Sequence, residues 1–126
     1  MMWREVYGKL TGKMNKDICW TIAVNCCVES YPYSKDETVL NTIIRIRSGE
    51  CGREKLMEIL NKICRIRSNE KEDLKAREAA HVVLHAIEVI CSSNYVNASG
   101  HAARCLEALS KIDSTKSGEI VNRFLM

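Results

Sequence analysis

Residues 70–91 read EKEDLKAREAAHVVLHAIEVIC, and this stretch decides the fold class. Charged residues open it, and acidic side chains favour a helix start because they complement the helix dipole. Its apolar residues then recur at intervals of three and four, which is the period of an α-helix; they are Ala76, Ala80, Val83, Leu84, Ile87, Ile90 and Cys91. The stretch therefore predicts a long helix, from about Glu70 to about Cys91, with a wide buried face.

Similar periodicity on both sides of this stretch predicts further helices. They extend from Asn15 to just before Pro32, from Ser34 to Gly49, from Arg53 to Arg67, and from the break at Ser92-Ser93-Asn94 to about Asp113. Ser34 and Glu37 have the Ser-x-x-Glu spacing of a capping box at a helix start. Gly49 and Asn69 suit helix ends because glycine and asparagine tolerate the left-handed conformation. These signals predict short connections between consecutive helices.

The composition supports a fold made of a few long elements. The 126 residues include one proline and six glycines, too few for an all-β fold, which needs a turn about every 8–12 residues. The length corresponds to one domain. We therefore predict a single all-α domain over residues 1–126, a bundle of five to six mostly antiparallel helices. In this prediction residues 1–13 form a short helix, and residues 114–126 form a polar linker (114–118) and an amphipathic C-terminal tail.

Charge, hydropathy and cysteine content indicate a cytoplasmic protein. The net charge of +3 is mild, and no apolar run approaches the length of about 18 residues that a membrane span needs. The N-terminal residues lack the apolar segment of a signal peptide. None of the seven cysteines forms a Cys-x-x-Cys motif, so we expect reduced thiols, most of them buried as small apolar side chains. No membrane contact is expected.

Two histidines four residues apart suggest a metal site. His81 and His85 fall on adjacent turns of the predicted helix, with Glu78 and Glu88 on the same side. Glu78 and His101 are further candidate ligands. Val83, Ile87 and Ile90 occupy the opposite side, so we expect the histidine face to be the less buried one. An ordinary polar or interfacial face is the competing interpretation. The His-Glu-x-x-His order of zinc proteases is absent, and a di-iron site would need a second Glu-x-x-His motif. A divalent metal is the one cofactor to consider.

The same helix face, or the C-terminal tail, is a candidate interaction surface. Glu88 extends the His81/His85 face, and Phe124 and Leu125 form the apolar part of the tail. A short amphipathic segment after a linker buries little apolar surface by itself. The leading hypothesis from sequence is therefore a protein–protein interaction module that binds a protein partner or a second copy of itself.

Four arginines suggest nucleic-acid binding as another alternative. Arg45 and Arg47 close one predicted helix, and Arg65 and Arg67 close the next, within two similar sequences that begin at Leu40 and Leu60. Clustered arginines can bind phosphates. Acidic residues are interleaved with them, however, and neither a helix-turn-helix signature nor an aromatic stacking platform is present. Solvated helix ends are the favoured interpretation, and nucleic acid is not an expected partner.

The sequence carries no strong enzyme motif. There is no glycine-rich phosphate loop, no Gly-x-Ser-x-Gly elbow and no Asp-rich calcium loop. His101 and Cys105 are four residues apart, which would allow a nucleophilic pair, but no third group that would orient the histidine is evident. We therefore do not predict an enzyme.

Several short motifs resemble those of a family of small all-α prokaryotic immunity-protein domains of toxin systems. The similar segments are Tyr31-Pro32 followed by Asp36, Arg45 to Glu50, Ala79-Ala80-His81 and Ser99-Gly100-His101-Ala102. They extend loosely over residues 18–112. The family is richer in alanine and histidine on its last helix, where this chain has Arg104, Cys105 and Glu107. The resemblance implies a helical bundle that binds and neutralises a protein, and it transfers no catalytic residue.

Overall fold

The computed structural model describes residues 3–13, 16–50 and 52–125. The regular structure of these residues is entirely helical, which confirms the all-α prediction. They form seven α-helices and one short 3-10 helix, η1: α1 Trp3–Lys13, α2 Lys16–Ser30, η1 Tyr31–Tyr33, α3 Glu37–Ser48, α4 Arg53–Asn69, α5 Leu74–Cys91, α6 Tyr95–Ile112 and α7 Ser114–Leu125. The predicted number of five to six helices is therefore too low. Asn15, the predicted cap of the second helix, lies outside the described residues.

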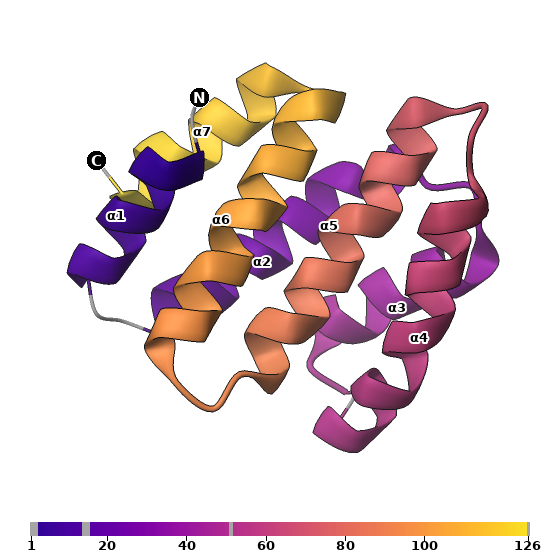
Figure 1. Cartoon of the computed structure of the whole chain (residues 1–126), viewed down its shortest axis with the longest axis horizontal. Helices are drawn as coiled ribbons and strands as arrows, with labels where there is room; N and C mark the ends of the chain where they lie inside the picture. The colour runs from indigo at the N-terminus through magenta and orange to yellow at the C-terminus, as the bar shows by residue number, and fades with distance from the viewer. Residues whose placement is uncertain (1–2, 14–15, 51, 126) are drawn as a thin grey trace.

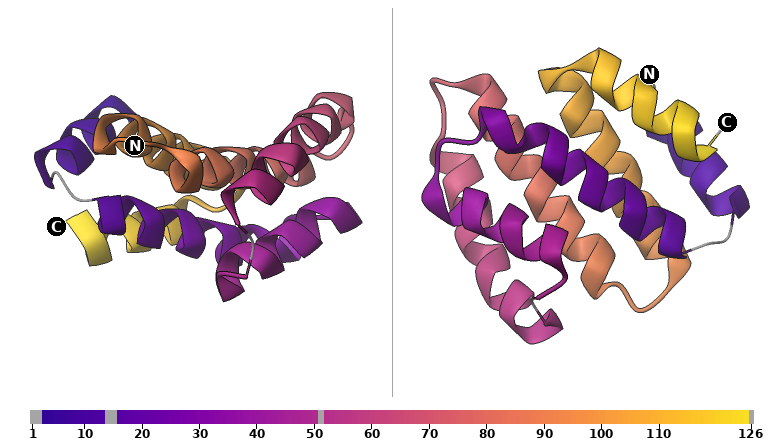
Figure 2. Two further views of the ribbon diagram at one scale, coloured as in Figure 1. Left: turned by 90° about the horizontal axis from the view of Figure 1, so that it is seen from below. Right: turned by 180° about the vertical axis from the view of Figure 1, so that it is seen from behind.

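The helices form two layers. One layer contains α1, α6, α5 and α4 side by side, and the other contains α7, α2 and α3 (Figure 1; Figure 2, left). Neighbours α4, α5 and α6 run in alternating directions (Figure 1). Helix α5 lies between α4 and α6 and also packs on α2. Because other helices surround it on three sides, α5 is the most buried helix of the described chain and has Val82, Val83 and Ala86 fully buried.

The predicted helix boundaries hold at α2 and at the end of α3. Helix α2 ends at Ser30, before Pro32, and Gly49 ends α3 with a φ of 72°. The predicted cap at Ser34 is wrong. Asp36 caps α3 instead, and its carboxylate accepts hydrogen bonds from the N–H groups of Thr38 (2.7 Å) and Val39 (3.3 Å).

The boundary between α4 and α5 also differs from the prediction. Asn69 is not a left-handed terminator, because it is the last helical residue of α4; Glu70 follows as the C-cap in an extended conformation. Helix α5 begins at Leu74 rather than near Glu70, with Asp73 accepting from the N–H of Ala76 at 3.0 Å. The Glu70 carboxylate accepts from the N–H of Asp73 at 2.9 Å. This local bond gives the N–H of Asp73 a hydrogen-bond partner outside a helix, so residues 70–73 form a short connection instead of the predicted first helical turn.

The core contains most of the described cysteines, as predicted. Those that are buried are Cys19, Cys26, Cys27, Cys91 and Cys105, and none of them is in a disulfide. Burial raises the pKa of the Cys27 thiol to about 12, so this thiol stays protonated and unreactive at neutral pH. Cys51 lies outside the described residues.

Residues 114–118 do not form the predicted linker, because they begin α7. The reason is the buried Ser117, whose hydroxyl donates to the Leu106 carbonyl of α6 at 2.8 Å. Ile120, Val121 and Leu125 are buried as well, and α7 packs on α6 and α2. The predicted amphipathic tail thus covers the body of the same chain. No helix in the described part of the chain is long and apolar enough to cross a membrane.

Candidate metal centre

One strip of α5 carries four polar side chains that a helical period of 3.6 residues brings into line: Glu78, His81, His85 and Glu88. His101 approaches this strip from α6. The exposed fractions of these five side chains are low, between 10% for His85 and 31% for His101. This face is the less buried side of α5, as predicted, because Val83 and Ile87 on the opposite side are fully buried whereas Glu78, His81 and Glu88 are partly exposed. His85 is nevertheless buried, because α4 and α6 flank α5 on both sides (Figure 1).

Three possible metal-ligand atoms converge toward the C-terminal end of α5. His85 Nδ1 lies 3.0 Å from His101 Nδ1, and Glu88 Oε2 lies 3.2 Å from His85 Nδ1 and 2.7 Å from His101 Nδ1. These three atoms are the only group of three or more histidine, cysteine or carboxylate ligands that forms a possible metal site within the described residues. We call His85, Glu88 and His101 the triad.

The spacing within the triad fits a bound metal ion. Ligand atoms about 2.1 Å from a zinc-sized ion lie about 3.0 Å apart when they occupy neighbouring octahedral positions, and about 3.4 Å apart in a tetrahedron. The three separations of the triad, 2.7–3.2 Å, are close to the octahedral value. Two histidines and one carboxylate on one face of an octahedron are also the ligands of non-haem iron sites.

Hydrogen bonding alone satisfies the triad incompletely. If both Nδ1 atoms are protonated, both donate to Glu88 Oε2, and the two N–H groups then oppose each other across 3.0 Å. If one Nδ1 is unprotonated, one bond to Glu88 is lost. A cation between the three atoms removes this conflict because each atom then presents a lone pair to it.

A second layer of contacts extends from the triad along α5. His85 Nε2 lies 2.9 Å from His81 Nε2, and His81 Nδ1 lies 3.2 Å from Glu78 Oε2. With a metal on His85 Nδ1, the ring proton resides on Nε2 and is donated to His81 Nε2. His81 then carries its own proton on Nδ1 and donates it to Glu78. One set of neutral tautomers satisfies the whole series, as is usual for the outer partners of metal-bound histidines.

The protonation states of the triad favour metal binding. Hydrogen bonds from His101 and His85 lower the pKa of Glu88 to about 2, so this side chain is a carboxylate at neutral pH. Burial lowers the pKa of His85 and keeps its imidazole neutral, which is the form that binds metals. For Glu78, burial raises the pKa, but the hydrogen bond from His81 and nearby cations outweigh it, so the net pKa is lowered.

The structure thus separates the metal ligands predicted from sequence into two groups. It brings together His85 and His101, and it places His81 and Glu78 one layer farther out. Glu88, which the sequence suggested only as an interaction residue, completes the triad. Its position three residues after His85 was a usable signal, since residues three apart share a helix face.

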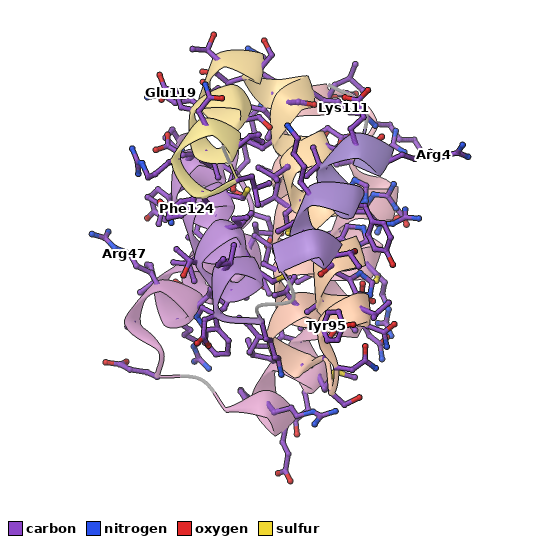
Figure 3. The ribbon with its side chains drawn as sticks, turned by 90° about the vertical axis from the view of Figure 1, so that its left-hand side faces the viewer. Arg4, Arg47, Tyr95, Lys111, Glu119 and Phe124 are labelled. Atoms are coloured by element: carbon purple, nitrogen blue, oxygen red, sulfur yellow. The ribbon has the colours of Figure 1, made fainter. Side chains whose placement is uncertain are left out.

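The other candidate residues lie away from the triad. Leu125 is buried and Phe124 packs against the core, so the tail leaves little free apolar surface. Arg45 and Arg47 are on α3, and Arg65 and Arg67 are on α4 in the other layer (Figure 2). Arg47 projects away from the body of the protein (Figure 3). The four arginines are thus divided between two helices of different layers.

A nucleophilic pair of His101 and Cys105 is not formed. The Cys105 thiol lies 3.5 Å from the Val82 carbonyl, whereas His101 Nδ1 faces Glu88. Burial raises the pKa of the Cys105 thiol well above its ordinary value, which opposes formation of a thiolate.

Two hollows on the surface are relevant to function. One, of about 320 Å³, lies on the α2–α3 side, far from the triad; it is lined by Val28, Tyr31, Pro32, Ile43, Ile44 and Arg47. The other, of about 410 Å³, includes His101 itself; its further lining residues are Tyr7, Val96, Asn97, Gly100 and Arg104. We call the second one the His101 hollow.

Comparison with known proteins finds no matching family model, no matching curated protein and no matching solved structure.

Proposed function

We propose that the protein binds one divalent transition-metal ion through His85, Glu88 and His101. The observation that carries this proposal is the convergence of two imidazole nitrogens and one carboxylate oxygen, 2.7–3.2 Å apart. Imidazole nitrogen suits zinc, iron, copper and nickel, whereas magnesium and calcium sites consist mainly of oxygen ligands. The ligand set therefore supports a transition metal rather than magnesium or calcium.

The surroundings of the triad support the same proposal. The ligand side chains are mostly covered, and Glu78 and His81 provide the outer hydrogen bonds that orient a metal-bound His85. Three protein ligands leave coordination positions vacant. Structural zinc sites have four protein ligands, whereas sites that bind water or substrate usually have three. The proposed ion would thus be able to take a further ligand from solution.

Titration of the untagged, metal-free protein with Zn²⁺ in a calorimeter tests the proposal. We expect one ion per chain. Glu88→Gln should weaken zinc binding more than about 100-fold, because loss of a direct ligand costs more than loss of an outer partner, which costs about 10–100-fold. Glu119→Gln is the matched control, since Glu119 is an exposed carboxylate on α7 and the substitution changes the charge equally. Absence of zinc binding, or equal affinities of the two variants, would contradict a site at the triad.

Protein binding is a second candidate function, favoured by exposed apolar side chains on the α2–α3 side. The exposed fractions are 40% for Trp20, 40% for Tyr31 and 51% for Ile44. Tyr31 and Ile44 line one hollow with Arg47, and Trp20 lines a neighbouring hollow that also includes Arg47. This surface supports the interaction hypothesis better than the covered tail does. Sedimentation at several concentrations tests self-association, which Ile44→Glu should abolish.

A further inference from the structure

The His101 hollow lies beside the proposed metal site, where α1 packs on α6 (Figures 1 and 3). Tyr7 of α1 closes one side of it: a Cβ atom at Gly100 would stand 3.6 Å from Tyr7 Cε2. The other lining residues follow one another along α6 at intervals of one and three, so they form one face of that helix. The hollow is thus a shallow site between two helices, with His101 in its wall.

The lining of the His101 hollow combines one cation with apolar surface. Arg104 and Asn97 provide N–H donors, the ring of Tyr7 and the exposed side chain of Val96 provide apolar contacts, and no carboxylate is among the described lining residues. Arginine binds carboxylates with a planar pair of donors. The chemistry of the hollow therefore fits a small organic carboxylate with an apolar body.

His101 connects this hollow to the triad. Its Nδ1 faces Glu88 at 2.7 Å. The two nitrogens of an imidazole lie on different edges of the ring, so the Nε2–H of His101 points away from Glu88. Metal-bound histidines almost always donate this second N–H to a carboxylate, a carbonyl or a water. His85 has His81 for this purpose, but no described residue pairs with Nε2 of His101. The hollow is where such an acceptor would bind.

We propose that the His101 hollow binds a small organic carboxylate between the Arg104 guanidinium and the Nε2–H of His101, and that this carboxylate and the metal ion strengthen each other's binding. The proposal rests on the proposed metal site. An acceptor on Nε2–H makes Nδ1 a more basic ligand. In return, a metal on Nδ1 makes Nε2–H a stronger donor. By thermodynamic linkage, the two affinities change by the same factor.

Calorimetric titration of the untagged full chain with Zn²⁺, at constant ionic strength, tests this coupling. Benzoate is the probe, and neutral benzamide, which has a similar shape, is its control. We expect benzoate to raise the zinc affinity about 10-fold, the lower end of the effect of outer partners on metal binding. Benzamide should leave the zinc affinity unchanged. Zinc should raise the benzoate affinity by the same factor, measured from NMR shifts of residues that line the hollow.

Variants locate the carboxylate. Arg104→Gln should abolish the effect of benzoate on zinc affinity, whereas Arg45→Gln, an equal charge change on exposed α3, should preserve it. If zinc binds but benzoate does not change its affinity, the coupling is wrong and the metal site stands. If the benzoate effect survives in Arg104→Gln, the carboxylate binds elsewhere, for instance on the metal, and the proposal is overturned. If zinc does not bind at all, the metal site itself is wrong and this inference fails with it.

Discussion

Glu88 is the residue on which the triad depends. It is the only carboxylate within reach of both His85 and His101 among the described residues, at 3.2 Å and 2.7 Å. His85 has a different role, because its two ring nitrogens face different partners: Nδ1 faces the triad and Nε2 faces His81. A substitution at His85 therefore removes a metal ligand and also breaks the hydrogen-bond series through His81 to Glu78. A substitution at His81 or Glu78 breaks this series but leaves all three metal ligands in place.

We predict that His81→Leu weakens zinc binding about 10–100-fold, because the Nε2–H of a metal-bound His85 loses its acceptor. His81→Gln, whose amide oxygen can accept a hydrogen bond, should recover part of this loss. Zinc titration of both variants and of the natural protein measures the difference. If the two variants have the same affinity as the natural protein, His81 has no role in orienting His85.

Two of the three triad residues, His85 and His101, were predictable as metal ligands at the level of residues. Sequence spacing placed His81, His85 and Glu78 on one helix face, and His101 was a candidate ligand. The role of Glu88 was missed because a carboxylate on a helix face is usually solvated. That His101 meets His85 and Glu88, rather than His81, depends on how far α6 is shifted along α5. That shift is set by the packing of the two helices, which the sequence pattern does not specify.

At the level of elements, the start of α3 shows two competing caps. Pro32 fixes the 3-10 helix η1, and the N–H of Ser34 bonds to the Tyr31 carbonyl at 3.2 Å. Ser34 thereby belongs to the end of η1 and cannot also cap α3. The capping-box pattern of the sequence was correct about a helix start nearby, but not about which residue caps it. The presence of η1 decides between Ser34 and Asp36.

We predict that Asp36→Ala lowers the free energy of unfolding by about 1 kcal/mol, the typical cost of losing an N-cap. Ser34→Ala should be neutral or slightly stabilising, because the Ser34 hydroxyl is buried without a hydrogen-bond partner. Urea unfolding of the two variants measures the difference. If Ser34→Ala lowers the free energy of unfolding more than Asp36→Ala does, Ser34 is the N-cap, as the capping-box pattern predicted.

At the scale of the whole molecule, acid should lower the free energy of unfolding in two separate pH intervals. The pKa of His85 is lowered from 6.5 by burial, and that of Glu88 is lowered from 4.5 to about 2 by its histidine partners. A group whose pKa is lower in the folded state binds fewer protons there, so it stabilises the folded protein at high pH. The stabilisation from His85 is lost as the pH falls below 6.5. That from Glu88 is lost between 4.5 and about 2.

Urea unfolding of the metal-free protein across this pH range checks the prediction. The free energy of unfolding should fall in both intervals. Glu88→Gln should flatten the lower interval, whereas Glu119→Gln should leave it unchanged. An unchanged slope in Glu88→Gln would mean that other carboxylates cause the acid sensitivity.

The layered arrangement was only partly predictable. The periodicity predicted helices and the composition excluded a β fold, so the all-α class followed. The start of α7 could not be predicted, because residues 114–118 are polar and include Gly118, a composition that resembles a linker. What makes these residues helical is tertiary: α6 and α2 offer a surface for Ile120, Val121 and Leu125, and the Leu106 carbonyl accepts from Ser117.

The connection between α5 and α6 spans only residues 92–94. The triad therefore lies within one helical hairpin, between positions 85 and 101, and forms without contributions from distant parts of the chain. Closing such a short loop costs little entropy, so the three ligand atoms can meet early during folding. It also means that a genetic rearrangement that moves this one hairpin would carry every ligand of the site with it.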